Sequence, residues 1–218
     1  MNHRLLTFIT FSFLTVVIFI FFWLRVQPIE PKLIETDTTI TEISEPSITF
    51  VNPTRGTDTP TLRIIEFGDF ECGPCSTMAS TLEAVLIANP DTIQLVWKDL
   101  PNESLHQFAT PAAIAAHCAD RQGAFWQYHD ELFARQSYLS ESQFPQIATD
   151  IGLDVGKFTS CFDTRDTLPI VKRDYNEAIG LGLTSTPTIF IGDEILIGAV
   201  STQTILDTVQ SELDRLSQ

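Results

Sequence analysis

The sequence predicts an α/β fold in which a βαβ unit, an all-helical insertion and a ββα unit follow one another. Three observations support this prediction. Two apolar runs of strand length flank a helical pattern within residues 62–97, no convincing strand pattern occurs in residues 104–182, and strand patterns return at residues 188–197 before a last helix. This order is typical of a sheet that has a helical segment inserted between its two halves.

An uncharged apolar segment precedes this domain. Residues 5–24 contain no charged side chain, and at about 1.5 Å per helical residue they span the hydrocarbon core of a membrane. No A-x-A-like cleavage pattern follows, so residues 1–25 are predicted to form an uncleaved signal anchor with a single transmembrane helix. The positive charges on the two sides of the apolar segment differ little, so they give only a weak indication of its orientation. Only residues 1–4 precede the segment, and so short an N-terminus is expected to stay in the cytoplasm. We therefore expect the rest of the chain outside the cytoplasmic (inner) membrane, in a periplasmic or equivalent space.

Residues 26–60 are predicted to form an extended linker, since prolines recur there among threonines and acidic residues without a helical or strand period. The apolar fragment at residues 47–51 is a candidate edge strand, which leaves the start of the domain open by several residues. We place the folded domain at residues 61–218 and its helical insertion at about residues 104–182.

Each half of the domain has its own pattern. In the first half a short apolar run ends at Gly68-Asp69, apolar residues at helical spacing follow, and Asn89-Pro90 stops the helix before a second strand. In the second half two short strands are joined by the turn residues Gly192-Asp193. The expected strands are residues 62–67, 93–97, 188–191 and 195–197, and the expected last helix is residues 202–216.

Composition limits the function. The chain has 13 Lys and Arg residues against 28 Asp and Glu residues, a net charge of -15. No basic stripe interrupts this acidic chain, so it repels phosphate backbones and nucleic acid is excluded as a partner. Four cysteines are too few for a disulfide-dense scaffold, and their spacing therefore decides their role.

Cys72-Gly73-Pro74-Cys75 lies after a predicted strand and at the start of a predicted helix, which is the position of a thiol redox motif. Unpaired N–H groups and the helix dipole stabilise a thiolate there, so Cys72 is the expected nucleophile and Cys75 the expected resolving thiol. One alternative is half of a zinc site, but no second C-x-x-C exists. The other is a purely structural disulfide, although so small a loop removes little chain entropy. We expect no metal and no cofactor.

The dipeptide Thr186-Pro187 stands immediately before the returning strand. Proline is poorly tolerated inside a sheet, so at this boundary we expect Pro187 to end a turn. A cis peptide bond is one way to do so.

Three segments of the sequence resemble the thioredoxin superfamily, and within it the DsbA-like branch that includes the membrane-anchored BdbD-type proteins. They are EFGDFECGPC at residues 66–75, AAIAAHCADRQGAFWQYHDELF at residues 112–133 and GLGLTSTPTIFIG at residues 180–192. The resemblance extends from residue 62 to about residue 216. It implies a thioredoxin fold with a helical insertion and the activity of a protein thiol-disulfide oxidoreductase.

The resemblance also implies roles for single residues. It places a cis-proline, Pro187, beside the cysteine pair, with the backbone of Thr186 pairing to substrate in the manner of a strand. The buried acid of the family, six residues before the nucleophile, falls on Glu66, where it is expected to exchange a proton with Cys75. The alternative for Glu66 is a strand residue paired with Lys98.

Cys118 and Cys161 both lie in the predicted insertion. If Cys72 pairs with Cys75, these two form the remaining intramolecular pair, and an oxidising compartment favours a structural disulfide between them. The alternative is two buried thiols that behave as small apolar residues.

The direction of electron flow stays open. In the leading hypothesis the enzyme donates its disulfide to exported cysteine-containing proteins and, as the resemblance implies, is reoxidised by a quinone-linked DsbB-like or VKOR-like membrane partner. Gly73-Pro74 resembles reducing thioredoxin, so the alternative is a reductase or isomerase that a membrane electron carrier keeps reduced. A third hypothesis, a non-catalytic peptide-binding module, is disfavoured by the intact cysteine pair.

Overall fold

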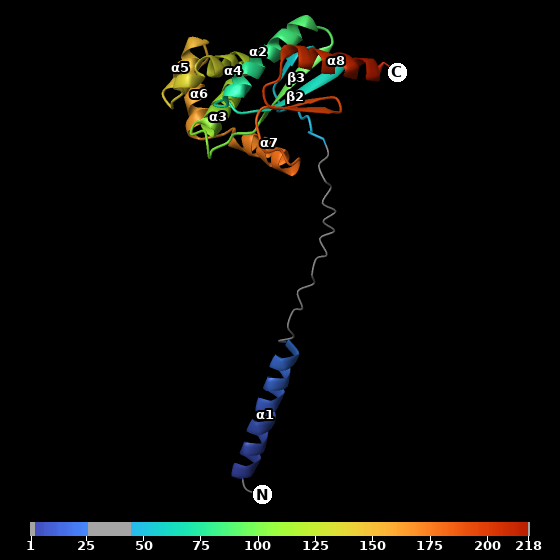
Figure 1. The fold of residues 1–218 in the computed structure, drawn as a ribbon. Helices are drawn as coiled ribbons and strands as arrows, with labels where there is room; N and C mark the ends of the chain where they lie inside the picture. The colour runs from blue at the N-terminus through green and yellow to red at the C-terminus, as the bar shows by residue number, and fades with distance from the viewer. Residues whose placement is uncertain (1–2, 26–44, 218) are drawn as a thin grey trace. The chain divides into compact units, whose positions relative to one another are not determined.

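The computed structural model describes residues 3–25 and 45–217, which belong to two separate units (Figure 1). The first unit contains helix α1 (His3–Arg25). The second contains all the strands and the remaining helices of the described residues. Residues 26–44, where more than half of the expected linker lies, are outside the described residues.

Helix α1 coincides with the apolar segment in which the sequence predicts a transmembrane helix. A membrane crossing needs about 20 consecutive apolar residues in one helix. Among the described residues, no helix is long and apolar enough to make such a crossing. The transmembrane anchor expected at residues 5–24 is therefore not supported by the structure.

In residues 45–217 a five-stranded mixed sheet has the strand order β1-β3-β2-β4-β5. The two central strands, β2 and β3, are parallel, as the predicted βαβ unit requires, and the other pairs are antiparallel. The strands are β1 (Thr54–Gly56), β2 (Leu62–Gly68), β3 (Ile93–Asp99), β4 (Thr188–Ile191) and β5 (Glu194–Ile197).

The sheet begins earlier in the chain than expected. Strand β1 pairs with β3, with Arg55 opposite Leu95, so the folded unit starts before residue 61. The edge strand is also not the apolar fragment at residues 47–51. Gly56 ends β1 with a φ of +109°, and a Cβ there would lie 2.4 Å from the carbonyl oxygen of Ile93, so the close approach requires glycine.

Helices cover both faces of the sheet. Helices α2 (Gly73–Ala88) and α8 (Thr202–Leu216) pack on one face, where a buried cluster includes Met78, Leu82 and Ile205. Helix α7 (Leu168–Gly180) packs on the other face through Ala178, against Phe67 and Phe190 of the sheet. This arrangement is visible in Figure 1.

The residues between β3 and β4 contain only helices and loops, in agreement with the predicted insertion. Besides α7 and a short 3₁₀ turn at Gln136–Tyr138, the insertion consists of α3 (Ala109–Asp120), α4 (Phe125–Ala134), α5 (Gln143–Asp150) and α6 (Val155–Asp163). Helices α3 to α6 gather at one end of the sheet (Figure 1). Their buried side chains form one apolar cluster that also contains both cysteines of the C-x-x-C motif.

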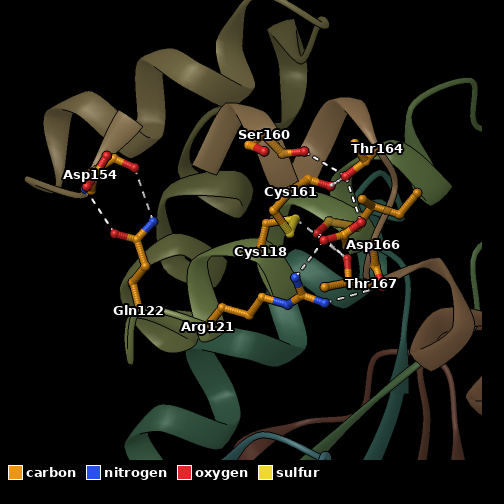
Figure 2. The surroundings of a disulfide bond; sticks show 10 residues. Cys118, Arg121, Gln122, Asp154, Ser160, Cys161, Thr164, Asp166 and Thr167 are labelled. Atoms are coloured by element: carbon orange, nitrogen blue, oxygen red, sulfur yellow. Dashed lines mark hydrogen bonds and ion pairs between the residues drawn. A yellow bond between two sulfur atoms is a disulfide. The ribbon is translucent and has the colours of Figure 1, made fainter. Parts of the chain in front are cut away.

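A disulfide joins Cys118 of α3 to Cys161 of α6, with a Cα to Cα distance of 5.8 Å (Figure 2). An ion pair between Arg121 and Asp166, 2.9 Å from Nη1 to Oδ2, lies beside it. The alternative of two separate buried thiols is therefore not the state of this structure. The disulfide thus links α3, the first helix of the insertion, to α6.

Candidate active site

Cys72 is the N-cap residue of α2. Its backbone is extended, and its sulfur accepts a hydrogen bond from the backbone N–H of Cys75 at 3.3 Å. Pro74 stands in the first turn, where a missing N–H costs little because N–H groups there have no helical partner. The motif thus places one sulfur at the end of the helix and the other one turn inside it.

The surroundings of Cys72 favour its thiolate. A hydrogen bond from the Cys75 side chain is the largest cause that lowers the pKa of Cys72 to about 6, and hydrogen bonds from the Thr186 side chain and the Cys75 backbone act in the same direction. Partial burial and the charge of Asp69 oppose this shift without cancelling it. Because a free cysteine has a pKa of about 8.5, Cys72 is mostly thiolate at neutral pH.

Cys75 has the opposite environment. Its side chain is fully buried, whereas Cys72 keeps an exposed fraction of 5%. Burial is the main cause that raises the pKa of Cys75 far above its ordinary value, and the contact with Cys72 and the charge of Glu66 add to the rise. In the reduced protein the proton therefore stays on Cys75. This difference supports the predicted roles of the two thiols.

Glu66 is fully buried in β2, and neither of its carboxylate oxygens has a hydrogen-bond partner among the described residues. Burial, with a smaller contribution from the charge of Cys72, raises the pKa of Glu66 to about 8. Its charge in turn raises the pKa of Cys75. Glu66 and the cysteine pair are thus electrostatically linked, and Glu66 is protonated at neutral pH.

The alternative interpretation of Glu66, a strand residue paired with Lys98, is wrong. In the parallel register of β2 and β3, Lys98 stands opposite Phe67, and Glu66 stands opposite Trp97. Lys98 is fully buried and binds two acidic residues of α7, Asp174 at 3.2 Å and Glu177. Lys98 therefore forms its ion pairs with α7 and not with Glu66.

The loop before β4 reaches the reactive sulfur. The Cys72 thiol donates to the backbone carbonyl of Thr186, with 3.3 Å between Sγ and O. The Thr186-Pro187 peptide bond is cis. The Pro187 carbonyl accepts a hydrogen bond from the N–H of Gly198 at 2.8 Å, which ties this loop to the end of β5. The structure therefore brings Cys72 and Thr186 into direct contact across more than one hundred residues of sequence.

A family model described as thioredoxin matches residues 51–211. The chain belongs to this thioredoxin family. The match begins before β1 and ends within α8, so it includes the whole sheet, the insertion and every residue of the site described above.

The curated relatives that this chain matches are much longer than the chain itself. The Na(+)/H(+) antiporter NhaA of Herminiimonas arsenicoxydans is 29% identical over 157 residues, which is 72% of this chain and 25% of that protein. The chain spans about a quarter of the length of the curated relatives that it matches.

Solved structures share the fold. The thiol-disulfide exchange protein α-DsbA2 of Wolbachia pipientis has a TM-score of 0.68 at 20% identity, over 75% of this chain and 88% of that one. Oxidised BdbD of Bacillus subtilis has a TM-score of 0.67 at 19% identity, over 75% of this chain and 94% of that one. The predicted thioredoxin-like α/β fold with its additional helices is thereby confirmed.

Two acidic residues beside the motif bind the loop between β3 and α3, a role that sequence reasoning missed. The Asp69 carboxylate accepts the N–H groups of Glu71 at 2.8 Å and Asn102 at 2.9 Å, and pairs with Nδ1 of His106 at 2.7 Å. The Glu71 carboxylate accepts the N–H of Phe108. Asp69 belongs to the quoted segment EFGDFECGPC, but nothing in the sequence marks His106, because only the fold brings it to Asp69.

The insertion also contacts the motif. Nε2 of Gln136, in the 3₁₀ turn after α4, donates to the carbonyl oxygens of Phe70 and Cys72, both at 2.9 Å. The turn that precedes α2 is therefore held from two sides, by the loop after β3 and by the insertion. Such support fixes the position of the Cys72 sulfur before any substrate arrives.

Proposed function

We propose that this thioredoxin is a protein thiol-disulfide oxidoreductase that reacts through Cys72 and Cys75. The observation that supports this most directly is the pair of unequal thiols at the start of α2, with a pKa of about 6 for Cys72 and a buried, protonated Cys75. A thiolate is the species that attacks and leaves in disulfide exchange, so a stabilised thiolate at Cys72 suits both steps.

The exchange proceeds in two steps from the oxidised enzyme. A substrate thiolate attacks Sγ of Cys72, so that a mixed disulfide forms and the Cys72–Cys75 bond breaks, which leaves a thiolate at Cys75. Glu66, protonated at neutral pH, supplies a proton toward this buried thiolate. A second substrate thiolate then attacks the substrate sulfur and releases the Cys72 thiolate. The substrate loses two electrons and gains a disulfide, and the enzyme gains both electrons as a dithiol.

In vivo we propose that the net reaction forms disulfides in exported proteins, and that a DsbB-like or VKOR-like membrane protein reoxidises the dithiol. A low pKa at Cys72 stabilises the reduced form and so makes the disulfide more oxidising. Gly73 and Pro74 provide no side-chain donor to the thiolate, and this observation favours a reductase or isomerase as the second candidate. Thr186 and Pro187 are proposed to bind the substrate chain beside the mixed disulfide.

We further propose that the domain works outside the cytoplasm, tethered by the apolar segment at residues 5–24. The disulfide between Cys118 and Cys161 supports an oxidising compartment, since structural disulfides are rare in the cytosol. The membrane anchor is supported by the uncharged sequence of that segment. Protease added to intact spheroplasts should release the domain, and its survival until the membrane is opened would reverse the proposed orientation.

The decisive experiment is the equilibrium of the Cys72–Cys75 pair with glutathione. A potential near -120 mV, the value of the strongest periplasmic oxidants, supports disulfide donation, and a value of about -270 mV supports reduction. A variant with Cys72→Ser and Cys75→Ser is the control and should show no exchange with a reduced dithiol peptide. Exchange that persists in this variant would show that Cys72 and Cys75 are not the reacting pair, and a wild-type chain that exchanges no faster than the variant would favour the binding module.

A further inference from the structure

A groove of about 600 Å³ lies beside the proposed redox site and has no part in the chemistry described so far. Three segments line it: the loop that follows β3, one face of α7, and the residues that lead to Pro187. The side chains used below are Glu103, Lys172, Tyr175, Ile179 and Thr186, and all of them belong to its lining.

One face of α7 presents apolar side chains to this groove. Leu168, Lys172, Tyr175 and Ile179 follow one another at spacings of four, three and four residues, which puts them on one side of the helix. Tyr175 and Ile179 are 39% and 53% exposed. The opposite side of α7 already contacts the sheet through Ala178, so packing within the domain does not explain the exposed pair. Exposed apolar side chains gathered along a groove are typical of a binding surface.

The groove reaches the reactive sulfur. Thr186 belongs to its lining, and the carbonyl oxygen of Thr186 lies 3.3 Å from Sγ of Cys72. A polypeptide joined to Cys72 by a mixed disulfide must therefore pass Thr186. The stripe from Leu168 to Ile179 is about 16 Å long at 1.5 Å per helical residue, which matches about five extended residues at 3.3 Å each.

The lining of the groove contains one basic residue, Lys172, and one acidic residue, Glu103. Within the described residues 45–217, Lys172 takes part in no hydrogen bond or ion pair, although the chain as a whole has a net charge of -15. Glu103, the acidic residue of the lining, already accepts a hydrogen bond from the Thr110 hydroxyl at 2.6 Å. Glu103 keeps its charge in that hydrogen bond, so an acidic group of a ligand is favoured beside Lys172, the one cation of the lining, and not beside Glu103.

We propose that this groove binds the extended segment of a substrate polypeptide next to its reacting cysteine, and that it selects a large apolar side chain accompanied by an acidic residue. The inference rests on the proposed exchange at Cys72. The apolar side chain lies against Tyr175 and Ile179, and the acidic side chain pairs with Lys172. Selection then occurs within about five residues of the cysteine, which separates favoured from disfavoured thiols in an unfolded chain.

The test compares two reduced peptides with the oxidised full chain. Both contain the same two cysteines, and beside the first cysteine one has Phe and Glu where the other has Ser and Lys. The measured quantity is the rate constant of each peptide divided by that of reduced glutathione, which is too small to reach α7. Burial of one aromatic side chain predicts a preference of about tenfold for the Phe and Glu peptide.

Three variants locate the preference. A double variant, Tyr175→Ser with Ile179→Ser, should lose most of the preference for Phe, and Lys172→Glu should transfer the charge preference from Glu to Lys. The matched control is Ile87→Ser, which replaces a 73% exposed isoleucine on α2 and should keep the full preference.

The outcomes separate the two proposals. If glutathione and both peptides fail to react, the proposed function fails. If all three react but the peptides have equal ratios, or the groove variants keep the wild-type preference, the groove proposal alone is overturned. A preference that disappears as the protein dimerises at higher concentration would make a second copy of the chain the occupant, which also overturns it.

Discussion

The backbone N–H of Cys75 donates a hydrogen bond to the sulfur of Cys72, 3.3 Å away, so the more deeply buried residue of the pair stabilises the thiolate of the other. The Cys75 side chain acts in the same direction and is the largest cause of the low pKa of Cys72. The two thiols therefore do not titrate independently. The lower pKa of Cys72 exists because the proton is held by Cys75.

The first prediction concerns reactivity. In the reduced chain, iodoacetamide should modify Cys72 first, with a rate that rises with pH to a plateau and has its midpoint near pH 6. A free cysteine would give a midpoint of about 8.5. Mass spectrometry of the labelled peptides identifies the site. The Cys75→Ser variant is informative, because a hydroxyl is a different donor to Cys72 and should move the midpoint. Preferential labelling of Cys75 would contradict the assigned roles.

The second prediction concerns Glu66. Its pKa of about 8 in the folded protein lies above the ordinary value, so ionisation is easier in the unfolded chain. Its neutral form stabilises the fold fully below about pH 4.5, and this contribution is lost as the pH rises toward 8. Glu66→Gln cannot ionise and should become more stable relative to the wild type over that interval, by a few kcal/mol.

Urea unfolding of both proteins at several pH values measures this difference in unfolding free energy. The difference should change between about pH 4.5 and 8 and stay constant below and above that interval. The exchange reaction provides an independent readout. If Glu66 exchanges a proton with Cys75, the variant should also slow the release of Cys75 at neutral pH. A pH-independent difference in stability would show that the pKa of Glu66 is the same in the folded and the unfolded chain, which would contradict the prediction.

The sequence predicts the central strands, the helix after the motif and the extent of the insertion, because long apolar runs with a clear period determine them. Strand β1 escapes prediction for a physical reason. Its three residues, Thr54 to Gly56, contain no apolar side chain, and their pairing with β3 depends on the close approach at Gly56. The start that the sequence predicts for the folded unit, residue 61, consequently lies after β1.

Some residues of the site can likewise be predicted from the sequence, and others cannot. Cys72 and Cys75 are recognisable from local sequence, since the motif and the helix start are adjacent. The partner of Lys98 was not recognisable, because it depends on the register of β2 with β3 and on α7. His106 and the apolar groove arise from segments that only the fold brings together.

The third prediction concerns the disulfide of the insertion. Cys118 and Cys161 are separated by 43 positions in sequence, and closing a loop of that size reduces the entropy of the unfolded chain. Replacing both with serine should lower the free energy of unfolding by about 2 to 4 kcal/mol. Urea unfolding measures the loss. A variant with Cys72→Ser and Cys75→Ser is the matched control and should lose much less. An equal loss in both variants would contradict the structural role of the disulfide.

The last prediction concerns the pair of His106 and Asp69. Partial burial opposes ionisation of His106, but the hydrogen bond to Asp69, helped by the charges of Asp69, Glu71 and Cys72, raises the pKa of His106 above its usual value. The charge of Asp69 raises the pKa of Cys72. Asp69→Asn should therefore lower the pKa of Cys72, and His106→Gln, which leaves Asp69 without its cation, should raise it.

Ultraviolet absorbance of the thiolate against pH gives the pKa of Cys72 in each variant, and the expected shifts have opposite signs. Opposite signs are the decisive feature, because a general loosening of the loop that Asp69 holds would move both variants in the same direction. Asp166→Asn removes a surface carboxylate of the insertion and is the control. Two shifts of the same sign would mean that the pair acts on Cys72 through loop position alone and not through its charges.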